Sequence, residues 1–323
     1  MYSLGFDIGG TKCAAVLGKD RISEDVSGFI IDKISFPTNV KRGWKEILNE
    51  LFLSADRLLE RNGISEPAKE LIGIGISCGG PLDSKKGTVH CPPNLPDWDN
   101  VPIVKMSEEH FGVKTYLQND ANACAAAEWR FGAGKGLSNM VFLTFGTGMG
   151  AGLILDGKLY SGTNDNAGEV GHIRLEHDGP EGYGKKGSFE GFCSGGGIAR
   201  LAAAELEKAE KQGIETVLSG AEELSAKTVA IAAKNGDAAA KRIYEICASK
   251  LGAGLSVLID VLNPEAIVIG SIYSRDKELF DEIINRVIKE EALPMSASVC
   301  RILPAKLGNA IGDFAALSLA FGS

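Results

Sequence analysis

Two stretches of this sequence decide its fold: SLGFDIGGTKCAAVLG at residues 3–18 and LTFGTGMGAGLIL at residues 143–155. Each places apolar residues on both sides of a short turn rich in glycine and threonine, which predicts a strand, a tight turn and a second strand. A helix would not tolerate the glycines of these turns in its interior. Because the same plan occurs twice, we expect two similar α/β units.

The residues after each pair of strands continue an α/β pattern. Apolar residues recur at helical spacing from Trp44 to Asn62, and Gly63 follows as a stop signal. The other strands are expected at 28–37, 71–78, 158–162 and 265–272, and the other helices at about 196–211, 238–262, 276–291 and 307–322.

A domain boundary is expected where TYLQNDANACAAAEWRFG (115–132) passes directly from a strand into a helix. This predicts a small N-terminal α/β domain at 1–118 and a larger α/β domain at 119–307. The closing helix at 308–323 is a candidate to return to the first domain.

Composition limits the function classes. The chain has 323 residues, 44% of them hydrophobic and 24% charged, as in a soluble globular protein. No apolar run approaches the roughly 18 residues of a membrane span, and the N-terminus lacks signal-peptide features. The net charge of −8 and the lack of a basic run disfavour a nucleic-acid partner. Seven scattered cysteines without a CxxC pair are typical of reduced thiols, so we expect a cytoplasmic protein.

Both glycine-rich turns offer groups that bind phosphate. Glycines let backbone N–H groups converge on an anion, threonines add hydroxyl donors, Lys12 adds positive charge, and Asp7 can hold Mg²⁺ through water. Neither turn fits the P-loop or dinucleotide patterns, and two ordinary hairpin turns are the alternative. Their occurrence at equivalent places favours phosphate binding. The candidate residues are Asp7, Gly9, Gly10, Thr11, Lys12, Thr144, Gly146, Thr147 and Gly148.

The two turns together resemble those of the sugar kinase/Hsp70/actin superfamily. More narrowly, GGTK, PNLPDW, QNDANACAAAE, GEVGH and VLNPEAIVIG resemble the ROK family of bacterial sugar kinases and related repressors, in the right order along essentially the whole chain. The resemblance implies two ribonuclease-H-like (actin-like ATPase) domains with an interdomain cleft. It also implies ATP and Mg²⁺ as cofactor and metal, and phosphorylation of a hexose hydroxyl.

The resemblance also assigns roles to particular residues. Asp120 matches the general base and Asn119 a sugar ligand, although from the residues alone either side chain could be a helix N-cap. Gly80 of CGGP (78–81) and Asn94 of PPNLPDW (92–98) are expected to face the sugar, or else to belong to a rigid connection. Gly270 and the SGGG segment (194–197) are expected on the nucleoside side.

The stretch EVGHIRLEHDGPEGYGKKGSFEGF (169–192) carries the remaining sugar ligands that the resemblance implies, Glu169, His172 and Glu190. The first two are three residues apart, so they share a face on a helical turn and point to opposite sides of an extended segment. The residues alone leave both alternatives open.

The middle of this stretch departs from the family. ROK proteins often carry CxCGxxGCxE here, whose three cysteines bind a structural zinc together with the ExGH histidine. In this chain those positions are Glu181, Tyr183 and Ser188, a poor set of zinc ligands, so we predict no structural zinc. Tyr183 and Phe189 are expected to fill the space instead.

The sequence therefore predicts an ATP-dependent sugar kinase, and the resemblance suggests a homodimer. One alternative is a sugar-sensing ROK protein without turnover, which retention of Asp120 and both turns disfavours. The other is a ROK transcriptional regulator. It would lack its DNA-binding segment, which in such regulators precedes the first turn, because the first strand is expected to begin by about Ser3. The sequence does not name the sugar; glucose or a related hexose is favoured.

Overall fold

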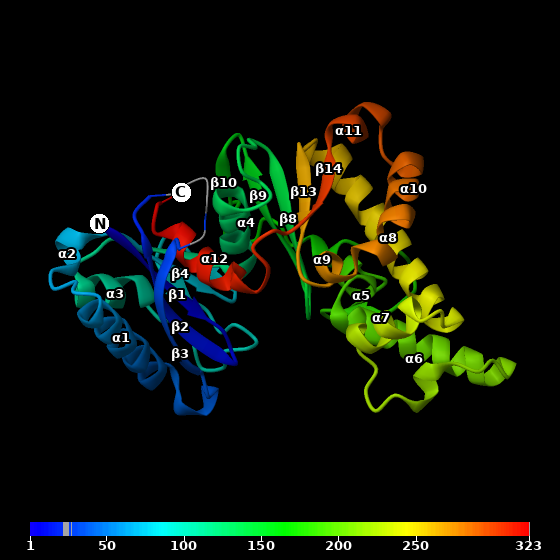
Figure 1. The fold of residues 1–323 in the computed structure, drawn as a ribbon, viewed down its shortest axis with the longest axis horizontal. Helices are drawn as coiled ribbons and strands as arrows, with labels where there is room; N and C mark the ends of the chain where they lie inside the picture. Colours follow the sequence, from blue (N-terminus) through cyan, green and yellow to red (C-terminus); the bar gives the residue numbers. More distant parts are fainter. Residues whose placement is uncertain (22–25, 27, 323) are drawn as a thin grey trace. The chain divides into compact units, whose positions relative to one another are not determined.

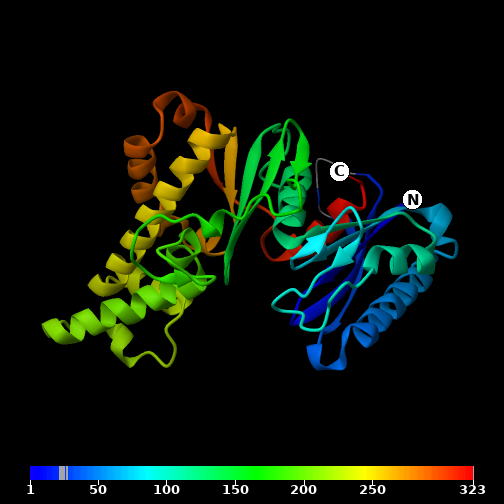
Figure 2. The same ribbon diagram turned by 180° about the vertical axis from the view of Figure 1, so that it is seen from behind.

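The computed structural model describes residues 1–21, 26 and 28–322 (Figures 1 and 2). Its contacts divide the chain into two compact units. Unit 1 comprises residues 1–138, 152–167 and 306–323, and unit 2 comprises residues 139–151 and 168–305.

Unit 1 is built on a five-stranded sheet of order β3-β2-β1-β4-β7. Strands β1 and β2 form the antiparallel hairpin around the first turn, with Ile8 opposite Cys13, while β4 pairs parallel to both β1 and β7. The elements of unit 1 are β1 (Tyr2–Ile8), β2 (Lys12–Lys19), β3 (Ile30–Pro37), α1 (Trp44–Arg61), α2 (Pro67–Glu70), β4 (Leu71–Cys78), β5 (Leu82–Asp83), β6 (Thr88–Val89), α3 (Ile103–Phe111), β7 (Thr115–Asn119), α4 (Asp120–Phe131), β10 (Lys158–Tyr160) and α12 (Ile311–Leu319).

Helices cover both faces of this sheet, and alternate strand residues serve the two cores. Leu4 and Phe6 of β1 pack in the core that contains the apolar residues of α1 and α3. Ala14 and Val16 of β2 point to the opposite core, which contains residues of α4 and α12. Figure 1 shows α1 and α3 on one side of the strands and α12 on the other.

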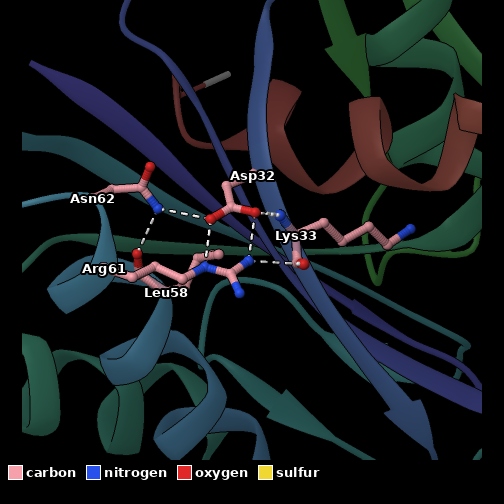
Figure 3. A network of polar contacts seen from close by, with 5 residues as sticks. All are labelled: Asp32, Lys33, Leu58, Arg61 and Asn62. Carbon is pink, nitrogen blue, oxygen red and sulfur yellow. Dashed lines mark hydrogen bonds and ion pairs between the residues drawn. The ribbon is translucent and has the colours of Figure 1, made fainter.

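A polar network fastens the end of α1 to strand β3 (Figure 3). The Asp32 carboxylate accepts hydrogen bonds from the Arg61 guanidinium, from Asn62 Nδ2 at 2.8 Å and from Lys33 N–H at 2.8 Å. Burial by itself would raise the pKa of Asp32, but the hydrogen bonds from Arg61 and Asn62 outweigh it and lower that pKa. Asn62 Nδ2 also donates to Leu58 O at 2.7 Å, which closes the helix end.

Helix α12 lies very close to β1 and β4 because three strand positions are glycine. A Cβ on Gly75 would lie 2.0 Å from Ala316 O, and one on Gly73 would lie 2.3 Å from Ala320 O. A Cβ on Gly5 would lie 2.9 Å from Leu317 N. The close approach of α12 explains why the LIGIGIS strand contains glycine, because only a residue without a side chain admits a helix backbone at this distance.

A buried carboxylate holds the loop after α4 and the chain leading to α12. Glu128 of α4 is fully buried and accepts N–H groups from Ala133 at 2.7 Å and from Lys306 and Leu307 at 2.9 Å each. These bonds satisfy the charge of a residue type that is rarely buried unless paired. Glu128 thereby fixes two segments that are far apart in the sequence.

The second five-stranded sheet repeats the plan of the first, with the order β10-β9-β8-β13-β14. Strand β13 pairs parallel to β8 and β14, and the division of the chain into units falls within β9. The predicted duplication of strand, turn and strand is therefore confirmed. The remaining elements are β8 (Met140–Phe145), β9 (Met149–Leu155), β11 (Glu181–Gly182), β12 (Lys185–Lys186), α5 (Phe189–Phe192), α6 (Gly195–Gln212), α7 (Ala226–Lys234), α8 (Ala238–Leu262), β13 (Ala266–Ile269), α9 (Ile272–Asp276), α10 (Asp281–Glu291), α11 (Pro294–Val299) and β14 (Arg301–Pro304).

The helix predicted at 276–291 is interrupted in the structure. Helix α9 ends at Asp276, a short 3₁₀ turn follows, and α10 begins only at Asp281. Phe280 lies at the break, fully buried against the rings of Phe145 and Tyr244. The helix thus breaks where this ring is buried, a position that helical periodicity alone did not indicate.

Candidate active site

The candidate residues form two groups, one in each unit. The group in unit 1 contains the first glycine-rich turn, Gly80, Asn94, Asn119 and Asp120. The group in unit 2 contains the second turn, Glu169, His172, Glu190 and Gly270.

The first turn is held by hydrogen bonds to its backbone, and its polar side chains are exposed to solvent. Gly9 N–H donates to Lys12 O at 3.0 Å, and the buried Thr38 hydroxyl donates to Gly9 O at 2.5 Å. Thr11 and Lys12 are exposed. A Cβ on Gly10 would lie 2.5 Å from Asn94 O, so this glycine lets the 92–98 loop lie against the turn.

Asp7 lies at the end of β1 in a cluster of charged groups. Burial raises its pKa, and the neighbouring Asp313 carboxylate raises it further, whereas Lys12 and Lys33 lower it. Lys33 forms an ion pair with Asp313. The Asp120 carboxylate also acts on Asp7 and raises its pKa, so the structure brings these two predicted site residues within electrostatic range.

Asn119 and Asp120 have different positions at the start of α4. Asn119 is the N-cap, and its Oδ1 accepts the Asn122 N–H at 2.8 Å. Asp120 is the first residue of the helix, and its Oδ1 accepts the Ala121 N–H at 2.8 Å. Asp120 is exposed, and partial desolvation of its carboxylate raises its pKa.

Gly80 and Asn94 lie beside this junction. A Cβ on Gly80 would lie 3.8 Å from Asn119 Cβ, and one on Gly79 would lie 3.0 Å from Asn94 Oδ1. Leu95 and Trp98 are fully buried and anchor the 92–98 loop, which leaves Asn94 exposed. Unit 1 thus brings Gly80, Asn94 and Asn119 together.

Asp165 is a site-supporting residue that the sequence analysis missed. Its buried carboxylate accepts the Ser84 N–H at 2.8 Å and the Ser84 hydroxyl at 2.7 Å. Its carbonyl oxygen accepts a hydrogen bond from Asn119 Nδ2 at 3.4 Å. The one signal in the sequence is the polar run TNDN between two glycines, typical of a residue with positive φ, and Asp165 has φ +62°.

The second turn in unit 2 is closed by Thr144. Its hydroxyl accepts the Gly150 N–H at 2.8 Å and donates to Gly150 O at 3.3 Å, so Thr144 bonds to the protein backbone here. Thr147 is exposed. Gly146 O accepts the Gly195 N–H at 2.7 Å, which joins the turn to the first residue of α6.

Gly270 lies buried at the end of β13 and donates its N–H to Leu143 O at 3.0 Å. Its neighbour Ser271 has φ +53°, and Ser271 Oγ would lie 3.6 Å from a Cβ on Gly146. The predicted nucleoside-side residues therefore lie next to the second turn.

Glu169 is the N-cap of a 3₁₀ turn (Val170–His172) and His172 is its last residue, so the helical alternative for this segment is correct. Both side chains are exposed. Gly171 between them is required by close packing, because a Cβ there would lie 2.2 Å from Met149 O. The ExGH turn therefore lies directly against the second glycine-rich turn.

Glu190 is half-buried, and its Oε2 accepts the Met149 N–H at 3.0 Å. Glu190 belongs to α5, which Ser188 caps: the buried Ser188 hydroxyl accepts the Gly191 N–H at 3.1 Å. The structure thus joins Glu190 to the second turn, a contact that the sequence analysis did not predict.

Hydrogen bonds close the loop that resembles a zinc loop. Gly187 N–H donates to Pro180 O at 3.0 Å, and Lys185 Nζ donates to His172 O at 2.7 Å. Phe189 is fully buried, as expected, but Tyr183 is 78% exposed, so the prediction that Tyr183 fills this space is wrong. Its left-handed backbone, with φ +46°, accompanies this outward position.

Over the part of the chain that is described, no three or more His, Cys, Asp or Glu side chains are grouped so as to hold a metal ion. Within the same residues, every helix is too short or too polar to cross a membrane.

Comparison with known proteins identifies the family. Residues 3–322 match the ROK family, and the chain belongs to it. It is 30% identical over 317 residues to a glucokinase of Thermotoga maritima, covering 98% of this chain and 96% of the relative. It is 34% identical over 284 residues to a xylose repressor of Caldicellulosiruptor bescii, covering 85% of this chain and 69% of the repressor.

Solved structures agree with this assignment. The ROK family glucokinase of Streptomyces griseus, in complex with glucose and AMPPNP, is 30% identical with a TM-score of 0.74, and the match covers 100% of both chains. The predicted fold class, the two-domain actin-like α/β fold of ROK kinases, is confirmed.

Proposed function

We propose that this chain is an ATP-dependent sugar kinase that transfers the γ-phosphoryl group to a hexose hydroxyl. The observation that carries the proposal is Asp120. Asn119 provides the helix cap, the Asp120 carboxylate bonds through Oδ1 to the neighbouring Ala121 N–H, and desolvation raises its pKa as suits a general base. Two glucokinases, each 30% identical to this chain, support the same reaction class.

In the proposed reaction, Asp120 accepts the proton of the attacking hydroxyl as the oxygen bonds to the γ-phosphorus and ADP leaves. Asn94, Asn119 and the backbone at Gly80 orient the sugar in unit 1, and Glu169, His172 and Glu190 bind hydroxyls in unit 2. The glycine-rich turns provide backbone N–H groups for the phosphates.

Asp7 fits the role of a magnesium ligand. Mg²⁺ keeps several waters and takes only one or two protein carboxylates when it binds with substrate phosphates. Asp7 offers a half-buried carboxylate next to Lys12 and within electrostatic range of Asp120. The bound ion would neutralise charge on the phosphates, while Lys12 adds a second positive group.

A ROK regulator that senses a sugar without phosphorylating it is the second candidate. The xylose repressor relative, at 34% identity, favours it. The two candidates differ in turnover, because a sensor binds sugar without consuming ATP.

The test is ADP formation with Mg²⁺-ATP and a panel of glucose, fructose, N-acetylmannosamine, N-acetylglucosamine and allose. We expect sugar-dependent ADP release with at least one of them, and Asp120→Asn should lower kcat by about 10²–10⁴-fold while sugar still binds. Asp178→Asn, at a side chain 93% exposed, is the matched control and should keep full activity.

Sugar binding without ADP release in the wild type would instead favour the sensor. Near-normal turnover by Asp120→Asn would show that another group is the base.

A further inference from the structure

Glu190 makes a contact that sugar binding alone does not require. Its Oε2 accepts the backbone N–H of Met149, the residue that follows the glycine-rich turn at 146–148, at 3.0 Å. Among the described residues no hydrogen bond reaches its other oxygen, Oε1. One carboxylate therefore has one oxygen committed to the turn and one oxygen left for a ligand.

The surrounding packing is built for this contact. A Cβ on Gly148 would lie 2.8 Å from Glu190 Oε2, and a Cβ on Gly171 would lie 3.2 Å from Glu190 Cβ. On the other side, a Cβ on Gly197 would lie 3.0 Å from Glu190 O. Side chains at these three glycines would displace Glu190 from its present position.

A second hydrogen bond connects the turn to α6. The N-terminal residue of α6, Gly195, donates its N–H to Gly146 O at 2.7 Å. The turn is thus held from one side by Glu190 and from the other by the segment that begins α6, and both segments touch each other at Gly197.

We propose that Glu190 couples sugar binding to nucleotide binding by holding the phosphate turn at 146–149 through the Met149 N–H. This inference rests on the proposed kinase function. A sugar hydroxyl that donates to Oε1 restricts the rotation of the carboxylate, and the Met149 N–H and the turn are ordered with it. A nucleotide that binds afterwards then loses less conformational entropy, which makes the coupling positive. Glu190 acts here as a positioning residue for the phosphates.

The test measures the affinity for AMPPNP with Mg²⁺ by calorimetry, with and without saturating glucose or the best sugar of the panel. The wild type should bind AMPPNP more tightly when sugar is present, by a factor within the roughly 5- to 150-fold range of typical couplings. By reciprocity, AMPPNP should raise the sugar affinity by the same factor.

Three variants separate coupling from simple sugar contact. Glu190→Ala should reduce the factor to about one, and Glu190→Gln, whose amide oxygen still accepts the Met149 N–H, should restore part of it. Gly148→Ala keeps the carboxylate but displaces Oε2, so it should lower the factor. Glu181→Gln, the same chemical change at an exposed position of the same loop, should keep the wild-type factor.

An unchanged coupling factor in Glu190→Ala and Gly148→Ala would overturn the inference, as would a wild type that binds both ligands independently. If Glu190→Ala fails to fold by circular dichroism, Gly148→Ala decides. A wild type that binds no AMPPNP at all would overturn the kinase proposal itself and this inference with it.

Discussion

Asn119 and Asp120 have different roles at the start of α4, although from the sequence alone either side chain could cap the helix. Asn119 Oδ1 accepts the Asn122 N–H at the start of α4, and Asp120 lies one residue further with its carboxylate desolvated. Placing an anion at a helix N-terminus is favourable by about 0.3–1 kcal/mol, whereas desolvation of the Asp120 carboxylate raises its pKa.

The raised pKa of Asp120 predicts how activity and stability change with pH. A base must be ionised, so kcat/KM should fall on the acid side with a midpoint above the usual Asp value of about 3.9. The folded state favours the protonated form, so the stability associated with Asp120 is present at low pH and is lost as pH rises through its folded pKa. Asp120→Asn should therefore melt at a higher temperature than the wild type at pH 7, and the difference should vanish below pH of about 3.9.

The pH profile of kcat/KM and thermal melts at both pH values check this prediction, with circular dichroism to verify folding across the range. A destabilised Asp120→Asn at pH 7 would mean that the helix dipole and the bond to Ala121 outweigh desolvation.

Among the elements, α12 joins the two ends of the chain, because it is formed near the end of the described residues and packs against β1 and β4. Its backbone touches β4 at Gly75 and Gly73 and β1 at Gly5. Its N-terminal turn also lies beside the site, because a Cβ on Gly312 would lie 2.9 Å from Asp7 Oδ2. The packing of α12 therefore positions Asp7 as well as stabilising unit 1.

Gly75→Ala should destabilise the protein, because the added Cβ would overlap Ala316 O at 2.0 Å and the helix would have to move. Overpacking of this kind costs about 1–3 kcal/mol, which urea unfolding would detect as a lower midpoint. Gly220→Ala is the matched control, since nothing lies within 4 Å of its Cβ position. An equal midpoint for the two variants would contradict the close approach of α12.

At the scale of the whole molecule, the two sheets have the same strand order, and each carries a glycine-rich turn between its first two strands. The 169–192 loop is where this chain departs from the pattern of its family. Backbone hydrogen bonds, the capping hydroxyl of Ser188 and the buried ring of Phe189 hold the loop. The folding free energy that a structural zinc would contribute is expected to come from these contacts instead.

Protein purified without chelator should accordingly contain no stoichiometric zinc, and EDTA should leave its melting temperature unchanged. Elemental analysis by mass spectrometry, with a zinc-containing protein measured alongside, is the check. One zinc per chain, or a chelator-dependent fall in melting temperature, would show that Glu181, His172 or their neighbours rearrange to bind the metal.

The sequence by itself determined the duplicated strand–turn–strand plan, because glycine and threonine between two apolar runs allow few other structures. It also determined the family, and helix α8 at residues 238–262, where periodicity is long and strong. The domain boundary at 118/119 and the roles of the site residues stay predictions.

Only the tertiary structure decided the remaining features. It showed that Asn119 is the cap, that Tyr183 is exposed, and that the expected helix breaks at Phe280. It also brought Asp165 to Asn119 and Glu190 to Met149, across 46 and 41 residues of sequence. The physical reason is that these contacts depend on which backbone groups meet after packing, whereas propensity and periodicity describe only neighbours along the chain.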